Sequence, residues 1–145
     1  MWHFCAVILS SFLVLSNGCV CPWMTGDEMF CQADFVAVGT VTGEECRGHT
    51  YGEFCQETIA YTIALEEVWR KPPVDYWDQN TVTIRTEGHG PTCGMHLQNG
   101  KSYFIAGTLD SLGNSVISTC NSIVKLTEYA KQSFPDYKEK LQNCV

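Results

Sequence analysis

The organisation of this chain depends on Cys19-Val20-Cys21. This stretch follows an apolar run, residues 4–15, and the segment Ser16-Asn17-Gly18, whose first and last residues are small. That order is typical of a secretory signal peptide. We therefore predict a signal peptide over residues 1–18 and a secreted, extracellular protein, with an uncleaved membrane anchor as the alternative. Cleavage after Gly18 makes Cys19 the first residue and frees its α-amine.

The cysteine count indicates a disulfide-stabilised domain. Removing the leader takes away Cys5 and leaves eight of the nine cysteines, in 127 residues. An even number in a small secreted chain predicts four disulfides, although composition cannot choose among the possible pairings. Cys19 and Cys21 should not pair with each other, because side chains two residues apart on an extended chain run roughly parallel.

Charge and length exclude several classes of partner. The net charge of −7 argues against a nucleic-acid or heparin surface, since both require a basic patch. The leader is too short for a transmembrane helix, and no other stretch comes closer. We expect no nucleic-acid or membrane partner, and a monomer.

Apolar residues recur with a period of two in the central part of the chain, which predicts strands. The five strands are expected at residues 35–41, 59–68, 81–85, 102–109 and 115–119. The first is apolar or small on both faces, as in a buried strand. In the second, the apolar phase slips by one at Val68, which predicts a bulge. We expect a charged loop over residues 42–57 and an irregular loop over residues 88–94.

The two ends of the chain show helical signals. Residues 27–31 can form one helical turn, and after Cys120 the apolar spacing becomes helical, with Pro135 dividing that region into two short helices. Five short strands with an early bulge and flanking helices suit a mainly β fold. We predict a disulfide-stapled, five-stranded, OB-like closed barrel, with a β-sandwich as the alternative.

Five short motifs follow one another along the predicted mature chain. They are Cys19-Val20-Cys21, Phe30-Cys31-Gln32-Ala33-Asp34, Cys93-Gly94, Tyr103-Phe104-Ile105-Ala106-Gly107 and Thr119-Cys120. Together they resemble the inhibitory domain of the tissue inhibitors of metalloproteinases. The resemblance implies one netrin-like (NTR) inhibitory domain over residues 19–145 with an OB-type barrel.

The same resemblance implies the disulfide bonds Cys19–Cys93, Cys21–Cys120 and Cys31–Cys144. Cys46 and Cys55 are additional to the usual three bridges of the family, so we expect them to pair with each other. The sequence also departs from the family pattern in three ways. We expect no separate C-terminal domain with its six cysteines. Val20 replaces the Ser or Thr usual in vertebrate members, and a proline follows the second cysteine one residue early, at Pro22.

The resemblance implies an inhibitor rather than an enzyme, acting on zinc metalloproteinases of the matrix metalloproteinase or a related class. A catalytic zinc keeps one open position, which holds water. The α-amine and carbonyl of Cys19 form a chelate that can displace that water, while Val20 enters the specificity pocket. The expected protease-binding residues are Cys19, Val20, Cys21, Pro22, Gly90, Pro91 and Thr92. The protein needs no cofactor of its own and binds the zinc held by its target.

Several histidines, carboxylates and tryptophans allow more than one interpretation. His89, Cys93 and His96, with His49 as a fourth ligand, have spacing that could bind a metal, but we expect Cys93 in a disulfide and the histidines in solvated loops. Carboxylates at Glu66, Glu67, Asp75 and Asp78 are interpreted as a solvated rim, and Trp23, Trp69 and Trp77 as core or rim packing. The alternative function is a non-inhibitory netrin-like secreted binding module.

Overall fold

A computed structural model describes residues 19–90 and 92–144, so the predicted signal peptide lies outside the described residues. The strands are β1 (Phe35–Arg47), β2 (Thr50–Tyr51), β3 (Phe54–Cys55), β4 (Thr58–Arg70), β5 (Thr81–Glu87), β6 (Ser102–Leu109), β7 (Ser115–Val116) and β8 (Ile123–Leu126). The helices are α1 (Gly26–Gln32), η1 (Asp75–Asp78), α2 (Thr127–Ala130), η2 (Lys131–Ser133) and α3 (Phe134–Gln142). The mainly β class with short helices is confirmed.

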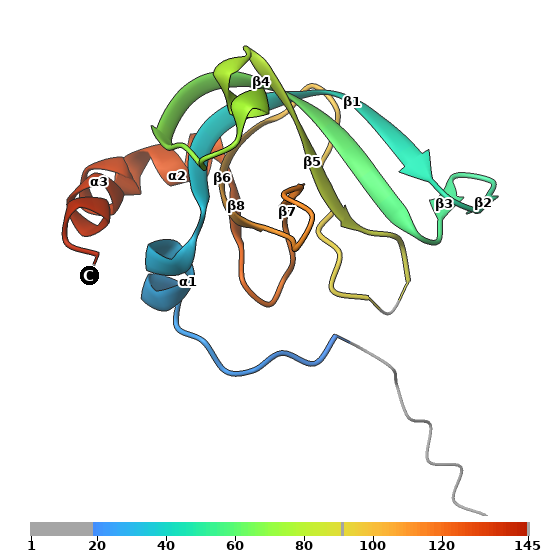
Figure 1. The fold of residues 1–145 in the computed structure, drawn as a ribbon, viewed down its shortest axis with the longest axis horizontal. Coiled ribbons are helices and arrows are strands. Elements are labelled where there is room, and N and C mark those ends of the chain that lie inside the picture. Colours follow the sequence, from blue (N-terminus) through green and yellow to red (C-terminus); the bar gives the residue numbers. More distant parts are fainter. Residues whose placement is uncertain (1–18, 91, 145) are drawn as a thin grey trace, which may run out of the picture.

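Six strands form one sheet in the order β1-β4-β5-β7-β6-β8, and β1 also pairs with β6. The pairing therefore returns from β6 to β1. All these pairs are antiparallel except β5–β7, which is parallel. Because the main strands share one sheet, the alternative of two packed sheets finds no support. The short β2–β3 hairpin projects from the far ends of β1 and β4 (Figure 1).

The predicted bulge lies where the apolar phase of β4 slips. The register of β4 against β1 shifts twice there, once beside Glu66 and once beside Trp69. Gly39 of β1 lies opposite this region, where a Cβ atom would come within 2.8 Å of the Ala64 carbonyl oxygen. Only glycine lets the two backbones approach so closely.

Three sequence-based boundaries were wrong. The predicted loop over residues 42–57 is largely strand, because β1 continues to Arg47 and pairs with β4 along its polar end, before the β2–β3 hairpin. The fifth strand is only Ser115–Val116. Residues 123–126, expected to begin a helix, form β8 and pair with β6. The irregular loop over 88–94 and the strand at 102–109 are confirmed.

The core is divided by the sheet into two clusters. One fills the space inside the ring of strands and includes Phe35, Tyr61 and Ile105. The other lies between the outer face of the sheet and the helices, and includes Phe30, Val36 and Phe104. β1 therefore contributes alternate residues to both clusters, as its two apolar faces predicted.

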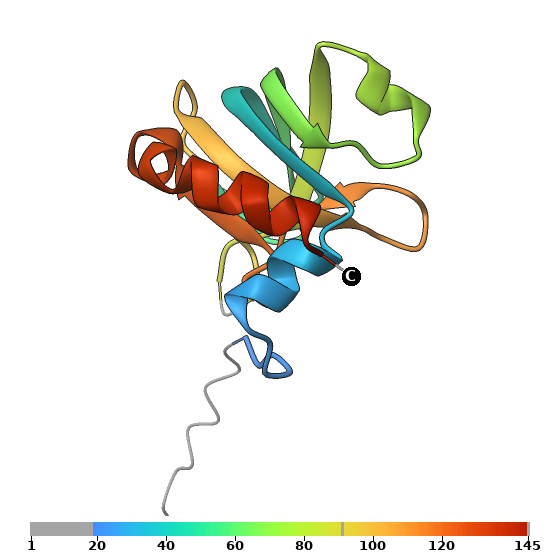
Figure 2. The same ribbon diagram turned by 90° about the vertical axis from the view of Figure 1, so that its left-hand side faces the viewer.

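The helices α1, α2 and α3 cover one side of the sheet (Figures 1 and 2). α1 follows the N-terminal segment and packs beside α3, whose first turn contains Pro135. The predicted division into two short helices is confirmed, with η2 between α2 and α3. Among the residues described, no helix has the length and apolar character required to cross a membrane.

Candidate functional site

Two disulfides hold the N-terminal segment against the sheet. Cys19 is bonded to Cys93, with Cα atoms 4.8 Å apart, and Cys21 is bonded to Cys120, with Cα atoms 5.1 Å apart. These are the pairs that the resemblance implied. The bridges span 74 and 99 residues of sequence, so each closes a long loop and restricts the unfolded chain strongly.

The two bridges touch each other. The sulfur of Cys19 lies 3.4 Å from that of Cys120 and 3.5 Å from that of Cys21. The sulfur of Cys93 lies 3.5 Å from that of Cys120. These four cysteines are the one group of potential metal ligands found in the described part of the chain. All four sulfurs are used in disulfides, so the group offers no thiolate to a metal or to a nucleophilic reaction.

The loop that carries Cys93 is fixed by its own polar groups. The backbone N–H of Cys93 donates to the Glu87 carboxylate at 2.8 Å. The hydroxyl of Thr92 donates to the Gly88 carbonyl at 2.7 Å and accepts from the N–H of Gly94 at 3.2 Å. Cys19 is thereby bonded to a rigid part of an otherwise irregular loop.

The segment around Cys120 is fixed in the same way. The N–H of Cys120 donates to the Ser118 hydroxyl at 3.0 Å, and the N–H of Thr119 donates to the Cys93 carbonyl at 3.0 Å. The Thr119 hydroxyl lies 3.2 Å from the sulfur of Cys19. The sequence marked Thr119 only as part of a motif, and its contact with Cys19 becomes visible only when the two cysteine-bearing segments meet.

His89 joins the β2–β3 hairpin to the same loop. Its Nδ1 accepts from the N–H of Cys55 at 2.8 Å, and its ring stacks on that of His96 with centroids 4.6 Å apart. The ring of Phe54 in the same hairpin also lies near His89, with centroids 5.3 Å apart. The expectation that His89 is merely solvated was therefore wrong. The burial of His96 and the neighbouring His89 lower the pKa of His96.

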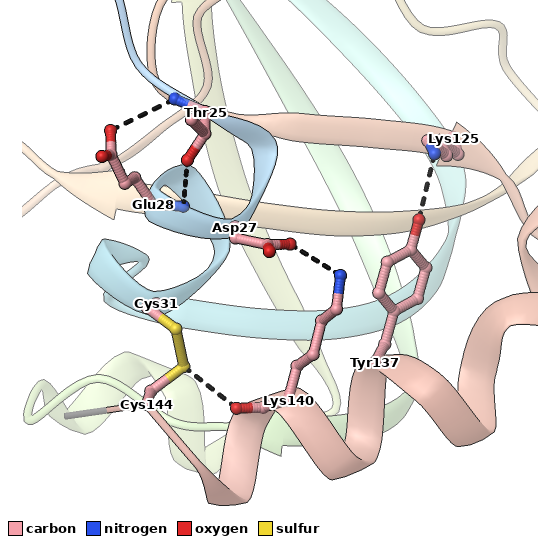
Figure 3. Close-up of polar contacts among 8 residues, drawn as sticks. All are labelled: Thr25, Asp27, Glu28, Cys31, Lys125, Tyr137, Lys140 and Cys144. Carbon is pink, nitrogen blue, oxygen red and sulfur yellow. Dashed lines mark hydrogen bonds and ion pairs between the residues drawn. A yellow bond between two sulfur atoms is a disulfide. The ribbon is translucent and has the colours of Figure 1, made fainter.

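Two further disulfides complete the framework. Cys46–Cys55 closes the hairpin after β1, and Cys31–Cys144 ties α1 to the end of α3 (Figure 3). With Cys93 in a disulfide, the metal site that its spacing with His89 and His96 suggested cannot use a thiolate from it.

Three of the four carboxylates interpreted as a solvated rim form separate contacts. Glu66 accepts from the Ser102 hydroxyl at 3.3 Å, Glu67 pairs with Lys138 at 3.2 Å, and Asp78 pairs with Lys71. Each is engaged with a different group, so they do not form a pair of carboxylates around a cavity.

The expected edge residues lie on two segments that a disulfide joins. The Cys19–Cys93 bond connects the N-terminal segment to the loop that contains Thr92 and Gly90, and Gly90 has a φ of 110°. Pro91 lies outside the described residues. Val20 is 90% exposed, and Cys21 and Pro22 are also exposed.

Comparison with known proteins identifies the family of this chain. The family model described as "Tissue inhibitor of metalloproteinase" matches residues 17–144. The chain belongs to the tissue inhibitor of metalloproteinase family. Cys19 and all eight cysteines of the four disulfides lie within the matched residues.

Two relatives illustrate the family similarity. The chain is 29% identical over 126 residues to metalloproteinase inhibitor 2 of Bos taurus, with 83% of this chain and 54% of the bovine protein aligned. It is 25% identical over 132 residues to tag-225 of Caenorhabditis elegans, whose name also contains the words metalloproteinase inhibitor; 81% of this chain and 75% of that protein align. The chain thus spans about half the length of the bovine relative.

Proposed function

We propose that this protein is a secreted inhibitor of zinc metalloproteinases, of the matrix metalloproteinase or a related class, and not an enzyme. The α-amine and carbonyl of Cys19 bind the catalytic zinc of the target and displace its water. Val20 enters the specificity pocket, and Cys21, Pro22, Gly90, Pro91 and Thr92 extend the contact. Family membership supports the inhibitory role, and we infer that zinc binding by the N-terminal Cys19 is the mechanism.

The observation that carries this proposal is the fixed backbone beside an exposed Val20. Cys19 and Cys21 are bonded to two segments that hydrogen-bond to each other, so the residue between them has little freedom. Its side chain is nevertheless 90% exposed. A rigid, protruding apolar residue loses little conformational entropy on binding, which favours tight association.

The chemistry of the terminus requires removal of the leader. A neutral α-amine has a lone pair for the metal, whereas the nitrogen of a peptide bond does not. We therefore infer that residues 1–18 are a cleaved signal peptide and that the active form is a monomer beginning at Cys19. We also infer that the ring of strands β1-β4-β5-β7-β6 is the closed OB-type barrel of the NTR domain, which supports the edge.

Two measurements test the proposal together. The first is the N-terminal residue of the secreted protein, determined by mass spectrometry and expected to be Cys19. The second is inhibition of isolated metalloproteinase catalytic domains, together with competition against a small hydroxamate that occupies the zinc. We expect the protein and the hydroxamate to exclude each other. Simultaneous binding of both would contradict zinc chelation and favour the non-inhibitory binding module.

A further inference from the structure

Trp23 differs from the other tryptophans described in the structure. Trp77 is buried in the core, and Trp69 packs against Phe104 and Phe134, as the packing interpretation predicted. Trp23 is instead 87% exposed, so its assignment to core or rim packing was wrong. Single exposed apolar side chains are common on protein surfaces, so a role for Trp23 depends on its backbone and its position.

The backbone on both sides of Trp23 is held in place. Two residues before it, Cys21 is bonded to Cys120. Two residues after it, Thr25 caps α1: its hydroxyl accepts from the N–H of Glu28 and its own N–H donates to the Glu28 carboxylate, both at 3.1 Å (Figure 3). Pro22 also fixes its own φ angle. Trp23 is therefore the central residue of a short segment fixed at both ends.

α1 is itself secured to the body of the protein. Asp27 pairs with Lys140 of α3 at 2.6 Å, and the Cys31–Cys144 disulfide joins α1 to the residue two positions after the end of α3 (Figure 3). On its inner face, Phe30 is 1% exposed and lies 5.5 Å from the ring of Tyr137. The segment that presents Trp23 thus has a rigid support on its C-terminal side.

Trp23 is also close to the proposed zinc-binding edge. It follows Val20 by three residues, so even a fully extended chain separates their Cα atoms by only about 10 Å. A target enzyme that takes Val20 into its pocket therefore presents surface within reach of Trp23. Tryptophan is one of the residue types enriched among those that dominate binding energy at protein interfaces.

We propose that Trp23 is a second specificity-determining residue of the inhibitory edge, an inference that rests on the proposed function. It binds an apolar depression on the target metalloproteinase beside the zinc cleft, and the indole N–H donates to an acceptor at the rim of that depression. Val20 and Trp23 together then select among target enzymes: an enzyme that has the pocket but lacks the depression is inhibited more weakly.

The test compares four proteins against a panel of metalloproteinase catalytic domains: wild type, Trp23→Ala, Trp23→Phe and Tyr129→Ala. Tyr129 is a matched control because it is an aromatic residue, 72% exposed, in α2 on the helical side of the molecule. We expect Trp23→Ala to raise the inhibition constant about tenfold or more for at least one enzyme and by a clearly different factor for another. Trp23→Phe should lie between wild type and Trp23→Ala, and Tyr129→Ala should match wild type.

Thermal unfolding and disulfide mapping should be the same in all four proteins, because Trp23 makes little contact with the fold. If wild type inhibits and Trp23→Ala inhibits every enzyme equally well, the role of Trp23 is refuted and the proposed function stands. If wild type inhibits no enzyme, both fail. Sedimentation supplies the last arm, because a dimer that Trp23→Ala dissociates would show that Trp23 binds a second copy of the chain, which overturns the inference.

Discussion

Val20→Gly tests the assignment of the specificity pocket quantitatively. Val20 is 90% exposed in the free protein, so nearly its whole side chain is available for burial in a complex. At about 0.8 kcal/mol per buried carbon, loss of its three side-chain carbons costs about 2.4 kcal/mol, or about 50-fold in the inhibition constant. Val20→Ala removes two carbons and should cost about 1.6 kcal/mol, or about 15-fold.

The alanine variant also controls for the backbone. Glycine adds flexibility at residue 20, whereas alanine does not, so a graded series indicates burial rather than loss of rigidity. The assay is inhibition of a panel of catalytic domains, with Tyr129→Ala as the control at an exposed site outside the edge. Thermal unfolding should not change. Inhibition by Val20→Gly within about threefold of wild type for every susceptible enzyme would refute the placement of Val20 in a pocket.

Three further predictions follow from the disulfides and the titrating groups. Labelling of the denatured, unreduced mature protein should find no free thiol among its eight cysteines, and any reactive thiol would contradict the four bridges. Inhibition should weaken as the pH falls below about 7.7–8.0, the reference pKa of an α-amine, because zinc binds only the neutral amine. The inhibition constant is corrected for the pH dependence of the enzyme itself. An unchanged constant after that correction would contradict the chelate. The folded chain lowers the pKa of His96, so the unfolded chain binds more protons and stability should fall as the pH drops through about 6.5. Denaturant unfolding should show that this loss is smaller in His96→Asn, and an equal loss in both proteins would refute the role of His96.

The sequence predicted best the elements whose ends carry turn chemistry. β6 was placed at its observed bounds. The turn dipeptide Asn99-Gly100 precedes this strand, and the turn residues Leu112-Gly113-Asn114 follow it. The polar end of β1 was missed because its Gly and Glu residues have low strand propensity; pairing with the long β4 imposes the strand there. β8 was missed for a different reason: it runs directly into α2, so its four residues were included in the helical spacing that follows, although Ile123 and Val124 favour a strand.

The sequence indicated which segments form the candidate site, but it did not indicate which side chains touch one another there. The cysteine spacing indicated that the terminus is fixed, and the family resemblance supplied the pairs. Contacts of Thr119 with Cys19 and of His89 with Cys55 depend on loops far apart in sequence, and no local pattern indicates them. The exposure of Trp23 was missed because composition favours burial of tryptophan, whereas here the disulfide and the helix cap on either side hold it outward.

The most direct test of zinc chelation adds one alanine before Cys19. The addition converts the α-amine into a peptide nitrogen, which has no lone pair for the metal, and places an extra residue beside the zinc. The two bridges that hold this segment, and the strands beyond, should form as before. Inhibition constants should be measured for the extended and mature proteins, with disulfide maps and unfolding curves as controls. We predict normal folding with inhibition lost by orders of magnitude, and an extended protein that inhibits as well as the mature one would contradict the proposed mechanism.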